Sequence, residues 1–220
     1  MAKEEVCLVY EMGNGEIVEK KSRFLAAVLP VKSEEEAIAQ IEQYKKKYWD
    51  ARHNCYAFSV GIDQPVLRFS DDGEPSGTAG KPILEVITGA GLHNVLIIVT
   101  RYFGGVLLGT GGLVRAYTKA AQAGIENSEI VVQKLGKKLQ IITDYTDVGK
   151  LQYLFAKEKI DVAEIAYEAE VKVTLYIPLS NRKQVEKQVT EMTSGRAVIT
   201  ELQQCYYFCH NGSYIVEEIE

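Results

Sequence analysis

A glycine-rich segment stands where an apolar strand pattern at residues 95–99 gives way to an apolar helix pattern from residue 113. It contains Gly104, Gly105, Gly109, Gly111 and Gly112, with Thr110 among them. Glycine concentrated at such a junction indicates that the backbone turns tightly or approaches another group closely. The N–H groups at the start of the following helix would then favour an anion, such as a phosphate or a carboxylate. The alternative is that the glycines only allow close packing and bind nothing.

Cationic and aromatic side chains flank this segment and could add to an anion site. Arg101 and Tyr102 precede the glycines, and Arg115 follows them. The spacing is not that of a phosphate-binding P-loop, because no Gly-Lys-Ser/Thr follows. It is not a dinucleotide fingerprint either, because no acidic residue on a second parallel strand is evident. The segment therefore predicts anion or partner binding and gives little support to a nucleotide enzyme.

A second polar motif is the loop of residues 71–82, in which three carboxylates fall within four positions. Its polar side chains are Asp71, Asp72, Glu74, Ser76, Thr78 and Lys81. Carboxylates this close together could hold Mg²⁺ or supply a general base. The alternative is a turn that leads into a helix capped by Ser76 or Thr78, with Lys81 paired to a carboxylate. We expect the loop to be ordered and exposed and to recognise a polar partner.

His53 begins a predicted strand, two residues before Cys55. Nothing obvious orients the imidazole toward the thiol, so we expect a hydrogen-bonded surface or pocket histidine rather than a catalytic pair. The group formed by Cys205, Cys209 and His210 lacks a partner pair at metal-ligand spacing. The sequence accordingly predicts no metal and no cofactor, and it assigns no catalytic residue.

The bulk composition excludes several classes of protein. The chain has 220 residues, of which 46% are hydrophobic and 25% charged, as is usual for a globular protein in solution. A net charge of −5 argues against nucleic-acid binding through charge alone, although a local basic patch stays open. No stretch reaches membrane-spanning length and no secretory leader is evident. With scattered cysteines, we expect a cytoplasmic location and no membrane contact.

The first half of the chain alternates strand and helix patterns. Ser33 and Glu36 form a capping box at the start of a helix, and the run Val95–Val99, apolar on both faces, predicts a central strand. Gly13-Asn14-Gly15 indicates a turn. The remaining predicted elements are strands within 5–31, a hairpin of 54–61 and 66–70, helices over 82–90 and 113–124, and a strand at 130–133.

The second half has the order β-α-β-β-α-β, which is typical of the ferredoxin-like fold. Its elements are predicted at 138–143, 146–157, 160–166, 171–177, 180–192 and 197–202. The aromatic run at 206–208 is interpreted as core or sheet packing rather than a base-stacking surface. A loop at Leu135-Gly136 sets the expected boundary between domains 1–135 and 136–210. The acidic end, residues 211–220, is predicted to be a flexible tail.

In their order and spacing these motifs resemble the IMPACT/YigZ family. The matching segments are Lys21-Ser22-Arg23-Phe24, residues 53–57, residues 71–82 and residues 100–117. The resemblance implies an α+β chain of two domains. The N-terminal α/β domain would be like the second domain of a small-subunit ribosomal protein, and the C-terminal domain would be ferredoxin-like, similar to the last domain of elongation factor G.

The resemblance also bears on function. Eukaryotic members are linked to translational control, restraining an amino-acid-starvation kinase by protein contact. The extra N-terminal interaction domain of those members is absent from this sequence, so that partner is not carried over. We expect a translation-associated regulatory binding protein, not an enzyme, that contacts the ribosome, RNA or a translation factor and not DNA. The alternative is an enzyme that binds a phosphorylated or nucleotide ligand at the glycine-rich segment.

Overall fold

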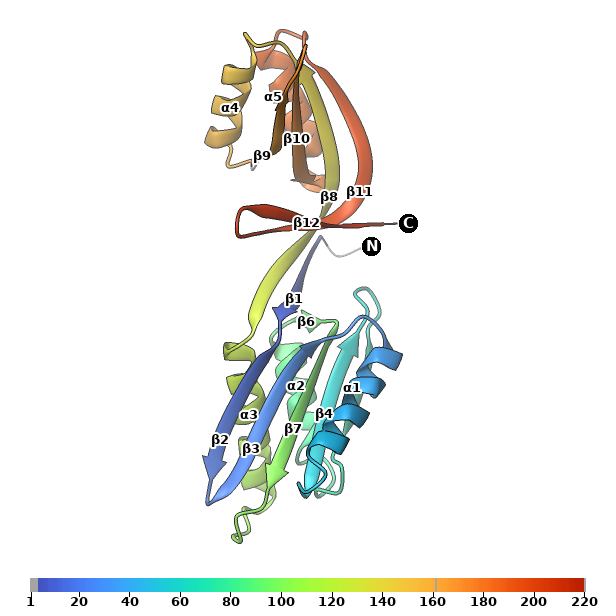
Figure 1. Ribbon diagram of the computed structural model, residues 1–220, viewed down its shortest axis with the longest axis vertical. Helices are drawn as coiled ribbons and strands as arrows, with labels where there is room; N and C mark the ends of the chain where they lie inside the picture. The colour runs from blue at the N-terminus through green and yellow to red at the C-terminus, as the bar shows by residue number, and fades with distance from the viewer. Residues whose placement is uncertain (1–3, 161, 220) are drawn as a thin grey trace. The chain divides into compact units, whose positions relative to one another are not determined.

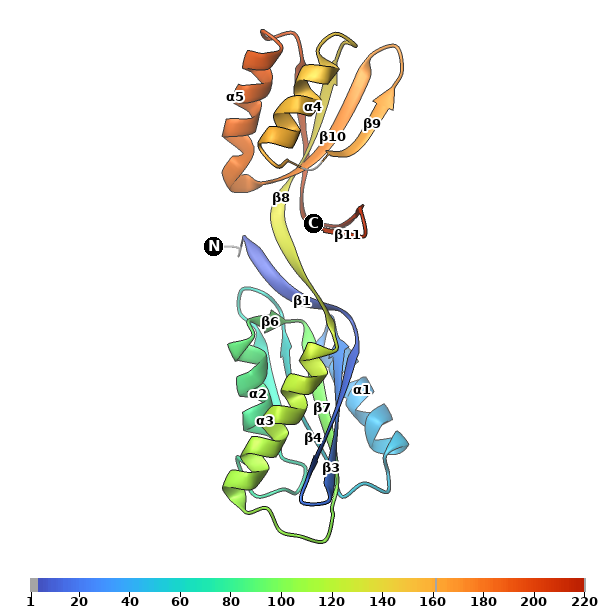
Figure 2. The same cartoon turned by 90° about the vertical axis from the view of Figure 1, so that its left-hand side faces the viewer.

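The computed structural model describes residues 4–160 and 162–219. The chain divides into two compact units: the first spans Val6–Val132, and the second consists of Glu4, Glu5 and the chain from Gln133 onward. Figures 1 and 2 show the first unit in blue to green and the second in yellow to red. No helix in the described ranges has the length and apolar character needed to cross a membrane.

A five-stranded antiparallel sheet forms the centre of the first unit, in the order β2-β3-β7-β4-β5. These strands are β2 (Gly13–Glu19), β3 (Ser22–Pro30), β7 (Val95–Tyr102), β4 (His53–Val60) and β5 (Val66–Ser70). The middle strand, β7, is buried at every residue but its last, which confirms the prediction of a central strand. Two further strands, β1 (Glu5–Glu11) and β6 (Leu92–His93), pair in parallel.

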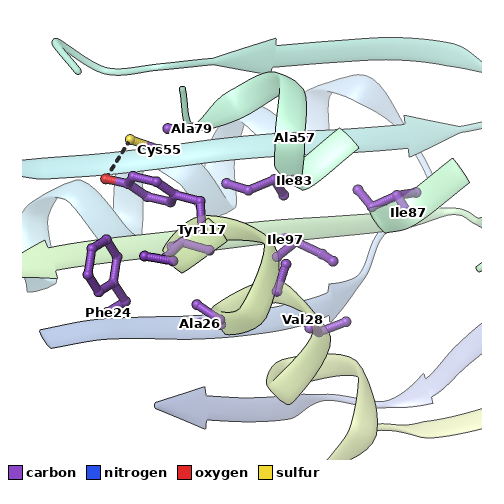
Figure 3. Packing of buried hydrophobic residues seen from close by; sticks show 14 of the residues in the cluster. Phe24, Ala26, Val28, Cys55, Ala57, Ala79, Ile83, Ile87, Ile97 and Tyr117 are labelled. Atoms are coloured by element: carbon purple, nitrogen blue, oxygen red, sulfur yellow. Dashed lines mark hydrogen bonds between the residues drawn. The ribbon is translucent and has the colours of Figure 1, made fainter. Parts of the chain in front are cut away.

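Helices cover both faces of this sheet (Figures 1 and 2). On one face, α1 (Glu34–Lys47) packs Ala37 and Ile41 against strand residues that include Leu96. On the other face lie α2 (Gly80–Gly89) and α3 (Thr110–Glu126), whose Ile83 and Tyr117 join the larger core drawn in Figure 3.

The start of α1 confirms the predicted cap. The backbone N–H of Glu36 donates to Ser33 Oγ at 3.1 Å, and the Glu36 carboxylate accepts from the N–H of Lys32 at 2.7 Å. Local sequence therefore determines where this helix begins.

The prediction of a turn at Gly13-Asn14-Gly15 is wrong, because these residues lie inside β2. The chain reverses instead at Lys20 and Lys21, which have φ of 45° and 66°. A Cβ on Gly15 would lie 2.5 Å from the backbone nitrogen of Gly124 in α3. These glycines are needed for close approach of helix and sheet.

The second unit confirms the predicted ferredoxin-like order. Its elements are β8 (Glu129–Thr143, which belongs to this unit from Gln133 onward), α4 (Val148–Lys157), β9 (Val162–Tyr167), β10 (Val171–Pro178), a 3₁₀ turn (Leu179–Asn181), α5 (Arg182–Met192) and β11 (Val198–His210). The strand order is β11-β8-β10-β9, with antiparallel neighbours. Leu139, Leu151 and Val173 lie in its core with no exposed surface.

The predicted loop at Leu135-Gly136 is wrong. Leu135 and Gly136 lie within the continuous strand β8, and the units divide between Val132 and Gln133. A Cβ on Gly136 would come 2.2 Å from the carbonyl oxygen of Ile177, so this glycine allows close strand packing and does not mark a loop.

The predicted flexible tail over residues 211–220 is wrong for residues 213–218, which form strand β12 (Ser213–Glu218), paired with β11. Asn211 and Gly212 make the connection with positive φ, as in a type I′ hairpin. The acidic residues at the end of the chain obscured this hairpin signal in the sequence.

Candidate binding site

A cleft of about 330 Å³ in the first unit brings the three polar motifs together. Its walls come from Arg52 and the start of β4, the acidic loop (residues 71–82), β7, the loop before α3, and α3 itself. The lining residues are Arg52, His53, Gly73, Glu74, Pro75, Arg101, Phe103, Leu107, Leu108, Gly109, Thr110 and Leu113. The glycine-rich connection between β7 and α3, seen at the foot of Figure 1, forms one side. Segments far apart in sequence thus share one site.

The centre of this site is the carboxylate of Glu74. Its Oε1 accepts from Arg101 Nη1 at 2.5 Å and from Tyr117 Oη at 2.9 Å, and it lies 3.8 Å from His53 Nε2. The Glu74 and Arg101 side chains are only 3% and 6% exposed. A buried ion pair with further hydrogen bonds therefore ties the acidic loop to the sheet and to α3.

Arg101 is held from several sides. Its guanidinium lies over the rings of Phe24 and Phe103, 5.4 and 5.6 Å from their centroids. Nη2 lies 3.5 Å from Ser22 Oγ. The buried Nε has no hydrogen-bond acceptor among the described residues. The Nε–H group of Arg101 therefore makes no hydrogen bond within the described residues.

His53 is a hydrogen-bonded pocket residue, as the sequence predicts. Its Nδ1 lies 2.8 Å from the carbonyl oxygen of Asp72, which can only accept, so Nδ1 carries the proton. In the neutral ring Nε2 is then a hydrogen-bond acceptor, and it lies on the side of the ring that faces the Glu74 carboxylate.

Cys55 is not a nucleophile in this arrangement. Its one thiol proton is shared between two acceptors, the Asp71 carbonyl at 3.0 Å and Tyr117 Oη at 3.3 Å, the latter drawn in Figure 3. Burial raises the pKa of the Cys55 thiol and that of the Tyr117 hydroxyl far above their usual ranges. Both groups stay protonated and act as fixed donors.

The carboxylates of the acidic loop have separate structural partners. Asp71 accepts the N–H groups of Ala79 at 2.9 Å and Gly80 at 2.8 Å, so it caps α2. Asp72 accepts from Lys45 Nζ at 2.5 Å and from the N–H of Asn54 at 2.7 Å. No group of three metal-ligating side chains occurs within residues 4–160 and 162–219.

Three predicted site residues of the loop have other roles. The expected cap of α2 by Ser76 or Thr78 is replaced by Asp71, and Thr78 Oγ1 donates to the Pro75 carbonyl at 2.6 Å. Ser76 is exposed and does not line the cleft. Lys81 is 64% exposed and lies 4.0 Å from Glu85, so it pairs with a carboxylate outside the cleft.

Tyr102 also lies outside the lining. Its hydroxyl donates to Asp50 Oδ1 at 3.0 Å. Partial burial and this carboxylate raise the pKa of the Tyr102 hydroxyl. The bond holds the end of β7 to the segment before β4.

The glycines divide between the packing and binding interpretations. A Cβ on Gly104 would lie 2.0 Å from the backbone of Lys21, so this glycine is needed for packing. Gly105 and Gly109 have φ of 85° and 72° and shape the loop. Gly109 precedes α3 and supplies no side-chain cap. Gly111 and Gly112 lie in the first turn of α3, which begins at the cleft.

Several lining residues escaped sequence reasoning. The exposed Arg52 lies with its guanidinium 5.4 Å from the Phe103 ring centroid. Leu107, another lining residue, is 83% exposed. Arg52 adjoins His53 in the sequence, and that adjacency is the signal that could have found it.

A smaller basic pocket of about 70 Å³ borders the cleft. Lys20, Arg115 and Lys119 line it, together with Leu108, which also lines the cleft. Arg115 therefore lies beside the main site rather than in it.

Known families cover most of the chain. Residues 20–125 match the Impact N-terminal domain, and residues 141–196 match a domain of unknown function, DUF1949. The sequence is 38% identical over 198 residues to "IMPACT family member YvyE" of Bacillus subtilis (strain 168), a match that spans 90% of this chain and 91% of that protein.

A second relative and a solved structure agree with this match. The sequence is 32% identical over 178 residues to "IMPACT family member YigZ" of Escherichia coli (strain K12), across 80% of this chain and 87% of that protein. A crystal structure of a hypothetical protein superposes with a TM-score of 0.58 at 28% identity, covering 91% of this chain and 98% of its own.

Proposed function

The chain belongs to the IMPACT family, as its ordered motifs predict, and from that premise we propose that it is a translation-associated regulatory protein that acts by binding. Its partner in this proposal is the ribosome, an RNA or a translation factor, and its location is the cytoplasm. The cleft of the first unit is the proposed contact. The support from the family is the link of its eukaryotic members to translational control.

The observation that carries the proposal is the convergence of three motifs on one cleft. His53, the loop residue Glu74 and the helix start at Thr110 all line it. If the motifs served packing alone, they would not need to surround an open cleft. Polar groups that converge on a cleft are typical of a binding site.

Binding is favoured over metal-dependent catalysis by the bonding of the carboxylates. A shared metal would need Asp71, Asp72 and Glu74 to face one point. Asp71 caps a helix, Asp72 pairs with Lys45, and Glu74 pairs with Arg101.

Co-sedimentation with ribosomes at low salt tests the proposal. Arg52→Ala removes an exposed charge from the cleft wall without opening the core. We expect about tenfold weaker association, because a hydrogen bond to a charged group contributes roughly 1.5 kcal/mol. Arg68→Ala is the matched control, since Arg68 is 61% exposed on β5 and pairs with Glu34 away from the cleft.

Equal loss in both variants would point to general charge rather than the cleft. A wild-type protein that sediments with neither ribosomes, ribosomal RNA nor translation factors would overturn the proposal.

A further inference from the structure

We infer that the cleft binds a nucleoside phosphate monoester, supplied either as a free mononucleotide or as the phosphorylated end of an RNA strand. This inference rests on the proposed function, because it names the chemical group through which the cleft would recognise its partner. The structural roles of Glu74, Arg101 and His53 do not explain why the cleft between them is open, and a bound ligand would explain it.

The charges of the wall suit a phosphate. Arg101 is neutralised by Glu74 at 2.5 Å, which leaves the exposed guanidinium of Arg52 to face an incoming anion. The wall is completed by Gly109 and Thr110, where α3 begins without a side-chain cap. Backbone N–H groups and the positive end of the helix dipole favour a phosphate at such a place.

A second observation, independent of the helix start, is the unpaired charge of Arg52. This exposed side chain lines the cleft and forms no ion pair with a carboxylate of the described residues. An anionic ligand would supply that counter-charge.

Other residues of the same lining suit a nucleoside. Phe103, Leu107 and Leu113 provide apolar surface, and Arg52 presents a planar guanidinium already lying over the Phe103 ring. Aromatic rings and arginine planes are the surfaces on which unpaired bases stack. A volume of about 330 Å³ lies at the small end of ligand sites, which fits one nucleotide and excludes a dinucleotide cofactor.

The neighbouring basic pocket favours the end of a strand as the source. Leu108 lies between the cleft and a lining that holds Lys20, Arg115, Lys119 and one carboxylate, Glu19, so a ligand that continues past Leu108 meets a net positive charge. A free mononucleotide does not need them, whereas the next phosphate of an RNA strand does.

Isothermal titration of the full chain with AMP, adenosine, inorganic phosphate, and a tetraribonucleotide with and without a 5′-phosphate tests the inference. We expect AMP or the phosphorylated tetranucleotide to bind, with adenosine, phosphate and the unphosphorylated strand at least about tenfold weaker. Arg52→Ala should weaken the binding by about tenfold, and Arg68→Ala should not. Circular dichroism checks that the variants are folded.

The two sources separate by their response to Arg115→Ala. A larger loss of tetranucleotide affinity than of AMP affinity identifies the strand end, and equal small effects identify the mononucleotide. The inference is overturned if no phosphorylated probe binds at millimolar concentration, or if phosphate alone or the unphosphorylated strand binds as well as its nucleotide counterpart. If ribosome association that depends on Arg52 persists in that case, the proposed function stands and only the ligand assignment falls.

Discussion

Glu74 is the residue on which the cleft depends most. One carboxylate oxygen accepts from Arg101 and Tyr117, and it lies within 3.8 Å of His53. These partners come from β7, α3 and β4, so a single loop residue connects three elements. Removing it leaves the Arg101 cation buried without its counter-charge, which costs far more than the lost hydrogen bonds.

Glu74→Ala is therefore expected to lower the free energy of unfolding of the first unit by about 3–5 kcal/mol. Urea denaturation followed by circular dichroism measures the change. Glu85→Ala serves as the control, because Glu85 is 66% exposed on α2 and should change stability by less than about 0.5 kcal/mol. Equal values for the two variants would mean that the ion pair contributes no net stability.

At this scale the sequence identified the polar residues but not their roles. Glu74 and Arg101 are 27 positions apart, and nothing local shows that they form a buried pair. Likewise, Asp71 caps a helix that begins nine residues later, which lies outside the usual capping spacing. Roles that depend on long-range contacts could not be predicted from neighbouring residues alone.

Among the elements, α3 has the closest contact with the sheet. Gly13 and Gly15 of β2 face it, and a Cβ on Gly15 would lie 2.5 to 2.6 Å from the backbone of Gly124 and Ala123. The start of α3 forms part of the cleft, so the position of this helix on β2 fixes the position of Thr110.

Gly15→Ala should push α3 away from the sheet and destabilise the first unit by about 1–3 kcal/mol. Thermal unfolding measures this effect, and a displaced α3 should also weaken any ligand held at its start. Gly89→Ala is the comparison, because Gly89 ends α2 with open space around its Cβ position. A neutral Gly15→Ala would show that helix and sheet separate without cost.

Most elements could be predicted because their signals are local. Capping at Ser33, alternation in 171–177 and the doubly apolar run at 95–99 each led to the right element. The Gly13-Asn14-Gly15 segment misled because a glycine needed for helix contact has the same appearance in sequence as a glycine needed for a turn.

For the molecule as a whole, charge is unevenly distributed. The net charge is −5, yet Lys20, Arg52, Arg115 and Lys119 gather at the cleft and its neighbouring pocket. An acidic protein with a local basic patch repels polyanions except where that patch faces them. Attraction through this patch should therefore depend on ionic strength.

Raising salt from about 50 to about 200 mM should weaken binding of the 5′-phosphorylated tetranucleotide by about sevenfold, if two phosphates are neutralised. Arg115→Ala should reduce the slope of log affinity against log salt by about 0.7. Titrations at several KCl concentrations measure both values. An affinity that does not change with salt would contradict the idea that these cations attract the tetranucleotide.

Trp49 gives the molecule an uncommon optical property. It is the only tryptophan of the chain, and 81% of its side chain is exposed. Its indole is already in water in the native protein, so its fluorescence changes little when the chain unfolds. If the tryptophan emission does not change in denaturant, this does not mean that the protein has stayed folded. Trp49 lies three positions before Arg52 in the sequence, outside the cleft lining, so its fluorescence is not a direct probe of a ligand in the cleft.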